Sequence, residues 1–167
     1  MSKPKLIFRE GTEKDSRFIL NKIKDLARFM DTEDMVTLTE DDFAKEFTSE
    51  NKFINLLIAE TDEEESKFVG YALFFPFFSS YSGKRLYLED LFIEEKYRGN
   101  GFGKVFFREI TKIGVEKGCH SMEWTTLPDN DIAVGFYKSL GAINKTETEK
   151  WHSYYLPKDV FMKIANS

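Results

Sequence analysis

The stretch LYLEDLFIEEKYRGNGFGK, residues 86–104, decides the fold class. Its first part, Leu86–Ile93, is apolar except for two adjacent carboxylates, which predicts a largely buried strand. Three glycines then alternate with other residues immediately before a helix, at positions 99, 101 and 103. The apolar residues of that predicted helix recur at helical spacing: Phe102, Phe106, Ile110 and Ile113. The order strand, glycine-rich turn, helix therefore sits in the middle of the chain.

Upstream of this stretch the sequence predicts a strand, two helices and a hairpin. Residues 6–8 form a short strand candidate, and capping patterns at Thr12/Asp15 and Thr39/Asp42 predict the starts of two helices. Aromatic-rich runs at 53–60 and 68–75 flank an acidic turn and predict two paired strands. A second turn at 79–83 extends the hairpin into an antiparallel meander that ends in the strand 86–93.

Downstream, the pattern predicts alternating helices and strands. The helix that starts after the glycines is expected to end near Gly118, and a strand to follow at 121–127. Asn130 or Asp131 caps a further predicted helix that ends before Gly141. Two closing strands are expected at 142–143 and 151–156. No repeat or linker divides the chain, so we predict one domain of mixed α and β structure over residues 1–167.

Composition excludes several classes of function. The chain has 167 residues, 41% of them hydrophobic, and a formal net charge of −5, so nucleic acid is not an expected partner. Its longest apolar run, 72–78, is far shorter than the roughly 20 residues of a membrane span, so no membrane association is expected. The single cysteine and the absence of a signal-peptide pattern indicate a cytoplasmic protein.

The alternating glycines form a candidate phosphate cradle. Glycines at a helix start let the backbone approach a ligand, and the amide groups of the first turn attract anions. The run fits neither the dinucleotide motif, whose third glycine would fall on Lys104, nor the P-loop spacing. Without further signals, a tight turn between strand and helix explains the glycines equally well.

The pattern Arg98-x-x-Gly101-x-Gly103 after a strand resembles the signature of the GNAT acetyltransferases. Further features are similar to those of the diamine (spermidine/spermine) N-acetyltransferases, a group that includes thialysine acetyltransferases. These features are Leu-Tyr-Leu-Glu-Asp at 86–90, Asn130, Phe136-Tyr137-Lys138, Gly141-Ala142 and Trp151. The resemblance implies the GNAT fold, an α/β (α+β) fold with a mostly antiparallel central sheet, a splayed central strand pair and flanking helices.

The resemblance also implies acetyl-CoA as cosubstrate and no metal. In this family the strand before the glycine loop pairs with the pantetheine arm, and the loop binds the pyrophosphate. The implied cofactor-binding residues are Leu91, Phe92, Ile93, Arg98, Gly99, Asn100, Gly101, Phe102, Gly103, Lys104, Asn130 and Tyr137. Asn130 is also a helix N-cap candidate, and the two roles are compatible.

Two residues match the catalytic groups of the family. Tyr137 matches a tyrosine beside the thioester sulfur, where a phenol can protonate the leaving thiolate. The acceptor amine must lose a proton, because an amine of pKa near 10.4 is neutral at pH 7 only about once in 2,500 molecules. Glu89 matches the carboxylate that assists this loss through water, and this role gives a reason for a charge in an otherwise apolar strand. Strand alternation predicts that Asp90 faces the opposite side of the sheet.

The substrate side is predicted from matches and from departures. Expected substrate-binding residues are Phe29, Glu89, Asp90, Glu149 and Trp151. Met30 and Ser79 stand where polyamine-binding relatives carry acidic residues, so two contacts to distal ammonium groups are expected to be missing. We therefore predict an N-acetyltransferase of a small diamine, a polyamine or a thialysine-like amino acid, which acts by direct attack.

Two other functions remain open, a protein-lysine acetyltransferase and an inactive acetyl-CoA-binding module. A homodimer is expected, because the subfamily dimerises and the predicted C-terminal strand carries Trp151, Tyr154 and Tyr155.

Overall fold

The computed structural model describes residues 4–49 and 52–167. Two compact units are formed, residues 1–127 and residues 128–167, and each is described separately below. The prediction of a single domain over the whole chain stays a prediction.

The first unit is a five-stranded sheet with helices on both faces. Its strands are β1 (Leu6–Glu10), β2 (Asn55–Thr61), β3 (Phe68–Ser79), β4 (Gly83–Ile93) and β5 (Met122–Glu123). Its helices are α1 (Ser16–Phe29), α2 (Glu40–Thr48) and α3 (Phe102–Glu116), with short 3₁₀ turns at Glu13–Asp15, Glu33–Met35 and Glu95–Tyr97. The predicted meander and the strand–turn–helix order are confirmed. Strand β5 is shorter than the predicted 121–127 strand.

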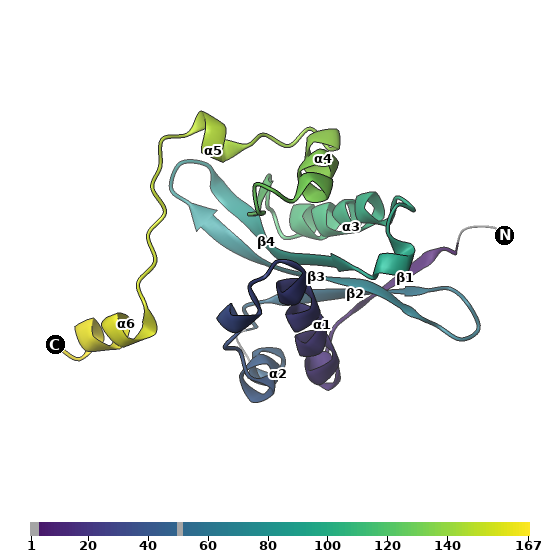
Figure 1. Cartoon of the computed structure of the whole chain (residues 1–167), viewed down its shortest axis with the longest axis horizontal. Coiled ribbons are helices and arrows are strands. Elements are labelled where there is room, and N and C mark those ends of the chain that lie inside the picture. The colour runs from purple at the N-terminus through teal and green to yellow at the C-terminus, as the bar shows by residue number, and fades with distance from the viewer. Residues whose placement is uncertain (1–3, 50–51) are drawn as a thin grey trace. The chain divides into compact units, whose positions relative to one another are not determined.

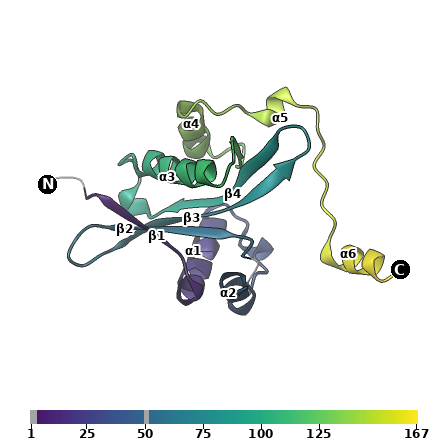
Figure 2. The ribbon, with the colours of Figure 1, turned by 180° about the vertical axis from the view of Figure 1, so that it is seen from behind.

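The sheet has the strand order β1-β2-β3-β4-β5. Neighbouring strands are antiparallel from β1 to β4, whereas β5 runs parallel to β4. Helices α1 and α2 lie on one face and α3 on the other, and the β3–β4 hairpin projects beyond them (Figure 1). The reverse view shows the same layering (Figure 2).

The α1/α2 face holds the main hydrophobic core. Capping fixes the start of α2, where the Thr39 hydroxyl accepts from the Asp42 amide over 3.2 Å, and the 3₁₀ turn that leads into α1, where the Thr12 amide donates to the Asp15 carboxylate over 2.8 Å. The core beneath these helices consists of Ile19, Leu20, Phe43, Leu56, Ile58, Tyr71, Leu73 and Phe92. Burial of this many large side chains is the main stabilising contribution of the face.

The opposite face is covered by α3. Phe106 and Ile110 of this helix are fully buried, and a Cβ at Gly114 would lie 2.6 Å from the Leu86 side chain. The absence of a side chain at position 114 therefore lets α3 lie close to β4. This contact assigns Leu86 to the α3 face of the sheet.

The second unit contains α4 (Asp131–Ser139), α5 (Lys145–Thr148) and α6 (Lys158–Ala165). The capped helix with a left-handed glycine at its end is confirmed, since Gly141 has φ of 83°. The two closing strands predicted at 142–143 and 151–156 are wrong: neither segment forms a strand. A strand exists only with a pairing partner, and no other strand of the described residues pairs with either segment.

Among the described residues, no helix combines the length and apolar character needed to cross a membrane.

Candidate active site

The glycine loop leads directly into α3. Gly99 and Gly101 have φ of 73° and 76°, in the left-handed region that favours glycine, and Gly101 is the N-cap of the helix. The Arg98 guanidinium fixes the start of the loop, because its Nε donates to the Ile93 carbonyl over 2.9 Å. Asn100 fixes the middle through its amide, which donates to the carbonyls of Tyr97 and Arg98. The loop therefore presents backbone amides at the positive end of the α3 dipole, as an anion cradle requires.

Phe102 anchors this cradle to the protein body. Its side chain is buried and meets the Tyr97 ring edge-on, with centroids 6.2 Å apart. Gly103 and Lys104 follow in the first helical turn, where the Lys104 amide donates to the Gly101 carbonyl. The whole predicted segment 98–104 thus forms one continuous structure at the helix start.

Strand β4 parts from β5 before it reaches the glycine loop. Pairing with β5 covers only Leu86 and Tyr87, whereas pairing with β3 continues to Ile93. Leu91, Phe92 and Ile93 therefore lie beyond the last β5 pair, along one edge of β4. The Phe92 side chain is in the core, so the part of this residue that can meet a ligand is its backbone.

A β-bulge at Glu89 interrupts β4. Asp90 pairs with Leu73 and Leu88 with Phe74, so Glu89 has no residue opposite it. The expectation that Glu89 and Asp90 face opposite sides rests on regular alternation, and the bulge removes that regularity. Because of the bulge, the residues on either side of Glu89 face opposite sides of the sheet. Leu88 shares the α3 face with Leu86, whereas Asp90 lies on the α1/α2 face.

Asp90 is held in the core face by a buried phenol. The hydroxyl of Tyr71, which is fully buried, donates to Asp90 Oδ2 over 3.1 Å. Burial raises the pKa of Asp90 to about 6; the hydrogen bond from Tyr71 opposes this rise and the nearby charge of Glu89 adds to it. Burial and the Asp90 charge also raise the pKa of Tyr71, so its proton stays in place at neutral pH. Glu89, by contrast, is exposed.

Phe29 links the predicted substrate and cofactor residues. It ends α1, its side chain is 58% exposed, and the Arg98 guanidinium lies 5.3 Å from its ring centroid. A cation at this distance from an aromatic face is attracted to it. The structure therefore brings together one residue predicted for the amine and one predicted for the cofactor.

The remaining predicted residues belong to the second unit. The Asn130 side chain accepts from the Ala133 amide over 3.1 Å, so its capping role is confirmed. Tyr137 lies on α4 and is partly buried, which raises the pKa of its phenol. Glu149 pairs with Lys145 over 3.3 Å, and Trp151 is 75% exposed. Within this unit, Glu149 and Trp151 follow α5 in a segment without regular structure.

Comparison with known proteins identifies the family. The family described as "Acetyltransferase (GNAT) family" matches residues 20–142. The chain belongs to the GNAT acetyltransferases. It is 32% identical over 165 residues to a thialysine N-epsilon-acetyltransferase of Sus scrofa, covering 96% of this chain and 97% of that protein. It is 27% identical to a human spermidine/spermine N(1)-acetyltransferase-like protein 1, covering 94% of this chain and 23% of that protein.

Solved structures support the same fold. An integron cassette protein of V. cholerae superposes with a TM-score of 0.71 at 22% identity, over 97% of this chain and 98% of that one. An aminoglycoside acetyltransferase from a soil metagenome gives a TM-score of 0.69 at 20% identity, over 92% of this chain and 97% of that one. The GNAT fold, with its mixed sheet and flanking helices, is therefore confirmed. The protein is a GNAT N-acetyltransferase, and acetyl-CoA is the acetyl donor of this family.

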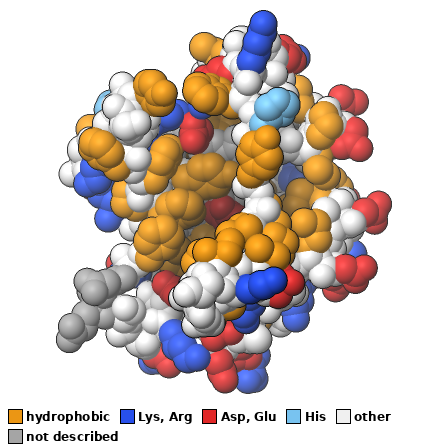
Figure 3. Space-filling model, turned by 90° about the vertical axis from the view of Figure 1, so that its left-hand side faces the viewer, with side chains coloured by type: hydrophobic (Ala, Val, Ile, Leu, Met, Phe, Trp, Pro, Cys, Tyr) orange, Lys and Arg blue, Asp and Glu red, His pale blue; other side chains and the backbone are white. Residues whose placement is uncertain are grey.

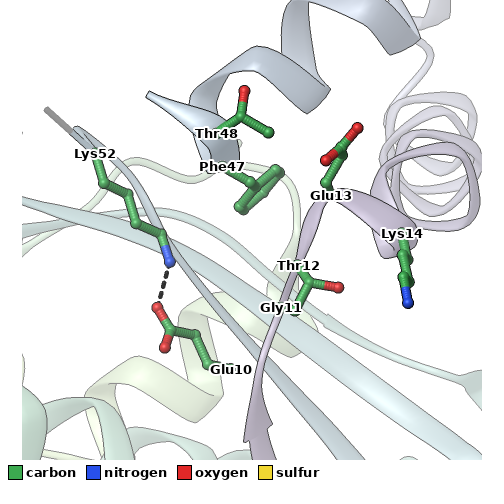
Figure 4. Close-up of a pocket in the computed structure, with 8 residues that line it drawn as sticks. All are labelled: Glu10, Gly11, Thr12, Glu13, Lys14, Phe47, Thr48 and Lys52. Atoms are coloured by element: carbon green, nitrogen blue, oxygen red, sulfur yellow. Dashed lines mark hydrogen bonds and ion pairs between the residues drawn. The ribbon is translucent and has the colours of Figure 1, made fainter. Parts of the chain in front are cut away.

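A separate pocket lies away from the glycine loop (Figure 4). It is lined by Glu10, Gly11, Thr12, Glu13, Lys14, Phe47, Thr48 and Lys52. An ion pair joins Lys52 to Glu10, as the dashed line in Figure 4 marks. None of the residues predicted for cofactor, substrate or catalysis lines this pocket.

Two contacts made by or beside the predicted site residues of β4 were missed from the sequence. Tyr71 reads as an ordinary core aromatic, and only the β3–β4 register reveals its contact with Asp90. Lys22 of α1 pairs with Glu94 over 2.6 Å and so joins the helix to the residue that follows β4. Neither contact has a local signal in the sequence, because each joins segments far apart in the chain.

Proposed function

We propose that the protein transfers the acetyl group of acetyl-CoA to the primary amine of a small molecule, by direct attack of the amine. The observation that carries this proposal is the pair of carboxylates at the β4 bulge, on the strand that ends at the glycine loop. The naming of similar proteins as thialysine acetyltransferases supports an amine acceptor.

The residues around the loop fit acetyl-CoA. Left-handed Gly99 and Gly101 leave the helix start open to a pyrophosphate, and positions 98–104 supply its amide and cationic groups. Beyond the β5 pairing, the backbone of 91–93 offers an edge to which an extended amide arm can add. Asn130 and Tyr137 are proposed to complete the cofactor site. The bound group supplies a thioester, an activated acetyl donor.

Proton transfer is assigned to three side chains. In the reaction a carbon–nitrogen bond forms, the carbon–sulfur bond breaks, one proton leaves the amine and one is taken up by sulfur. Asp90, with a pKa of about 6, is ionised at neutral pH and basic enough to receive a proton. Glu89 is exposed, so its carboxylate can hold a water molecule that contacts the amine. Tyr137 stays protonated because burial raises its pKa, so it can donate to the sulfur.

The substrate is proposed to be a small diamine, a polyamine or a thialysine-like amino acid. Phe29, Glu149 and Trp151 are assigned to its binding, and the replacements at Met30 and Ser79 favour short amines over spermine. A desolvated ammonium without a carboxylate partner binds poorly. A homodimer is proposed as well, because Trp151, Tyr154 and Tyr155 are at least 75% exposed in the second unit.

A thiol-release assay over a panel of amines tests the proposal, with binding of acetyl-CoA followed in parallel by calorimetry. We expect acetyl-CoA to bind and at least one small amine to release thiol in proportion to acetylated product. Binding without turnover of any amine would instead support an inactive binding module. Turnover of lysine-containing peptides alone would support a protein-lysine acetyltransferase.

A further inference from the structure

An aromatic surface lies beside Asp90 on the same face of the sheet. Phe75 pairs with Tyr87 in the row next to the Leu73–Asp90 pair, and the Phe77–Arg85 row follows. Phe53, just before β2, stacks on Phe75 with centroids 4.9 Å apart. We call Phe53, Phe75, Phe77 and Tyr87 the aromatic row.

The bulge at Glu89 creates this adjacency. In a regular strand Tyr87 and Asp90, three residues apart, would face opposite sides. With one extra residue between them they face the same side, about 7 Å apart along the strand at two regular steps of 3.3 Å. The aromatic row is therefore continuous with the carboxylate to which the proposed function assigns a proton.

Helices α1 and α2 do not bury the row. The core beneath them includes Leu73, Tyr71 and Phe92 but none of the four aromatic residues. Phe53 is 58% exposed, and the other three are partly buried. Hydrophobic side chains gather on one face of the molecule in Figure 3. Asp90 thus lies where the packed core ends and an accessible aromatic surface begins.

The geometry of the rings determines which ligand they suit. Phe53, Phe75 and Tyr87 stack with interplanar angles of 29° and 27°, so their faces are turned toward one another. The stack leaves for a ligand the ring edges and the outer face of Phe53, an end ring that is 58% exposed, and another aromatic ring or an apolar group packs against either surface. These surfaces suit an aromatic or apolar group of the acceptor.

The charges at the far end of the row agree with this. The Arg85 guanidinium lies 5.4 Å from the Phe77 ring centroid, and its Nη2 pairs with Glu123 over 2.7 Å. The rows Phe75–Tyr87, Phe77–Arg85 and Ser79–Gly83 contain no carboxylate of their own. Glu123 of the neighbouring strand β5 lies at this end of the row and is already paired with the Arg85 guanidinium. A second ammonium on the substrate would therefore lie near the Arg85 guanidinium and find no carboxylate in these three rows.

We propose that the acceptor is a primary amine with an aromatic or compact apolar group, which packs on the aromatic row while its nitrogen reaches Asp90. This inference rests on the proposed acetyl transfer, but it assigns a different acceptor class from the diamines, polyamines and thialysine-like amino acids proposed above. It places amines such as 2-phenylethylamine and hexylamine ahead of spermidine and thialysine.

The first experiment compares kcat/KM for 2-phenylethylamine, hexylamine, 1,3-diaminopropane, spermidine and thialysine with saturating acetyl-CoA. We expect the two apolar amines to exceed the others by about tenfold or more, the effect of one buried apolar group. Phe53→Ser should lower kcat/KM for 2-phenylethylamine by about fivefold to tenfold through KM, with kcat and the value for 1,3-diaminopropane unchanged. Phe78→Ser is the matched control, because Phe78 is 78% exposed and alternates to the other face of β3.

A binding measurement separates this inference from the acetyl transfer. Saturation-transfer NMR with 2-phenylethylamine should show transfer of saturation from the protein to the ring protons of the ligand. The size of this transfer should fall in Phe53→Ser and stay unchanged in Phe78→Ser. If the ring binds in this way but no amine is acetylated, the proposed function fails and the binding inference stands.

Two results would overturn the inference. One is a higher kcat/KM for spermidine or thialysine than for both apolar amines. The other is a sedimentation coefficient that falls in Phe53→Ser while amine selectivity is unchanged, because the row would then be covered by a second copy of the chain.

Discussion

Replacement of Asp90 by asparagine should make the fold more stable at neutral pH while it damages the enzyme. The pKa of Asp90 rises from 3.8 to about 6 in the folded state, chiefly because burial disfavours the charged carboxylate. A raised folded-state pKa means that the folded protein binds a proton more tightly than the unfolded chain does. Asp90 therefore favours folding at low pH, and this contribution is lost as the pH rises through the interval between 3.8 and about 6.

The magnitude follows from the shift. Two pKa units correspond to about 3 kcal/mol, which is an upper value because Asp90 is only partly buried. Asparagine has nearly the same shape, stays neutral, and offers an oxygen to the Tyr71 hydroxyl. The Asp90→Asn variant should then gain stability over the wild type by about 2 kcal/mol more at pH 8 than at pH 4.5.

Urea denaturation at several pH values measures this difference directly. Glu64→Gln is the control, since Glu64 is an exposed acid in the β2–β3 turn and should show no such dependence. Tyr71→Phe should raise the pKa of Asp90 further, because the hydrogen bond that favours the carboxylate is removed. A difference between Asp90→Asn and wild type that is the same at pH 4.5 and pH 8 would refute the assignment of a strained carboxylate.

Three further predictions concern the cofactor, the acid and the assembly. Gly101→Val should reduce acetyl-CoA affinity in calorimetry by about tenfold or more. Gly118→Val is the control, because Gly118 also has φ of 76° but lies at the other end of α3, and this variant should keep the affinity of the wild type. Equal acetyl-CoA affinities of Gly101→Val and the wild type would contradict the cradle. Tyr137→Phe should lower kcat by about 10²-fold with unchanged acetyl-CoA affinity in steady-state assays, and full activity would exclude Tyr137 as the acid. Sedimentation should show a dimer at micromolar concentration, and a monomer would contradict the proposed assembly.

The features that the sequence predicted well depend on interactions between residues close in the chain. The capping pairs Thr12/Asp15 and Thr39/Asp42 each join residues three apart, and both form hydrogen bonds as expected. The left-handed conformations of Gly101 and Gly141 likewise follow from the residue type and its place at a helix end. Local chemistry was sufficient to predict the glycine loop and the order of elements in residues 1–127.

The features that the sequence missed depend on register between distant segments. Leu86, Leu88, Asp90 and Phe92 alternate regularly in the sequence and predict one continuous face. In the structure the bulge assigns the first two to the α3 face and the last two to the α1/α2 face. The aromatic segment 151–156 failed for a related reason, because its strand propensity is favourable but no strand in the described residues pairs with it.

The bulge and the buried carboxylate are best explained together. Folding alone would favour an apolar residue at position 90, since ionised Asp90 lowers stability at neutral pH and its hydrogen bond from Tyr71 offsets only part of the effect. The extra residue Glu89 interrupts β4 at this point, turns Asp90 toward the α1/α2 face and places it beside the aromatic row. An unfavourable charge and an irregular strand at the same position, on the strand that leads to the glycine loop of an acetyltransferase, agree with our proposal that Asp90 handles the proton of the amine at some expense of stability.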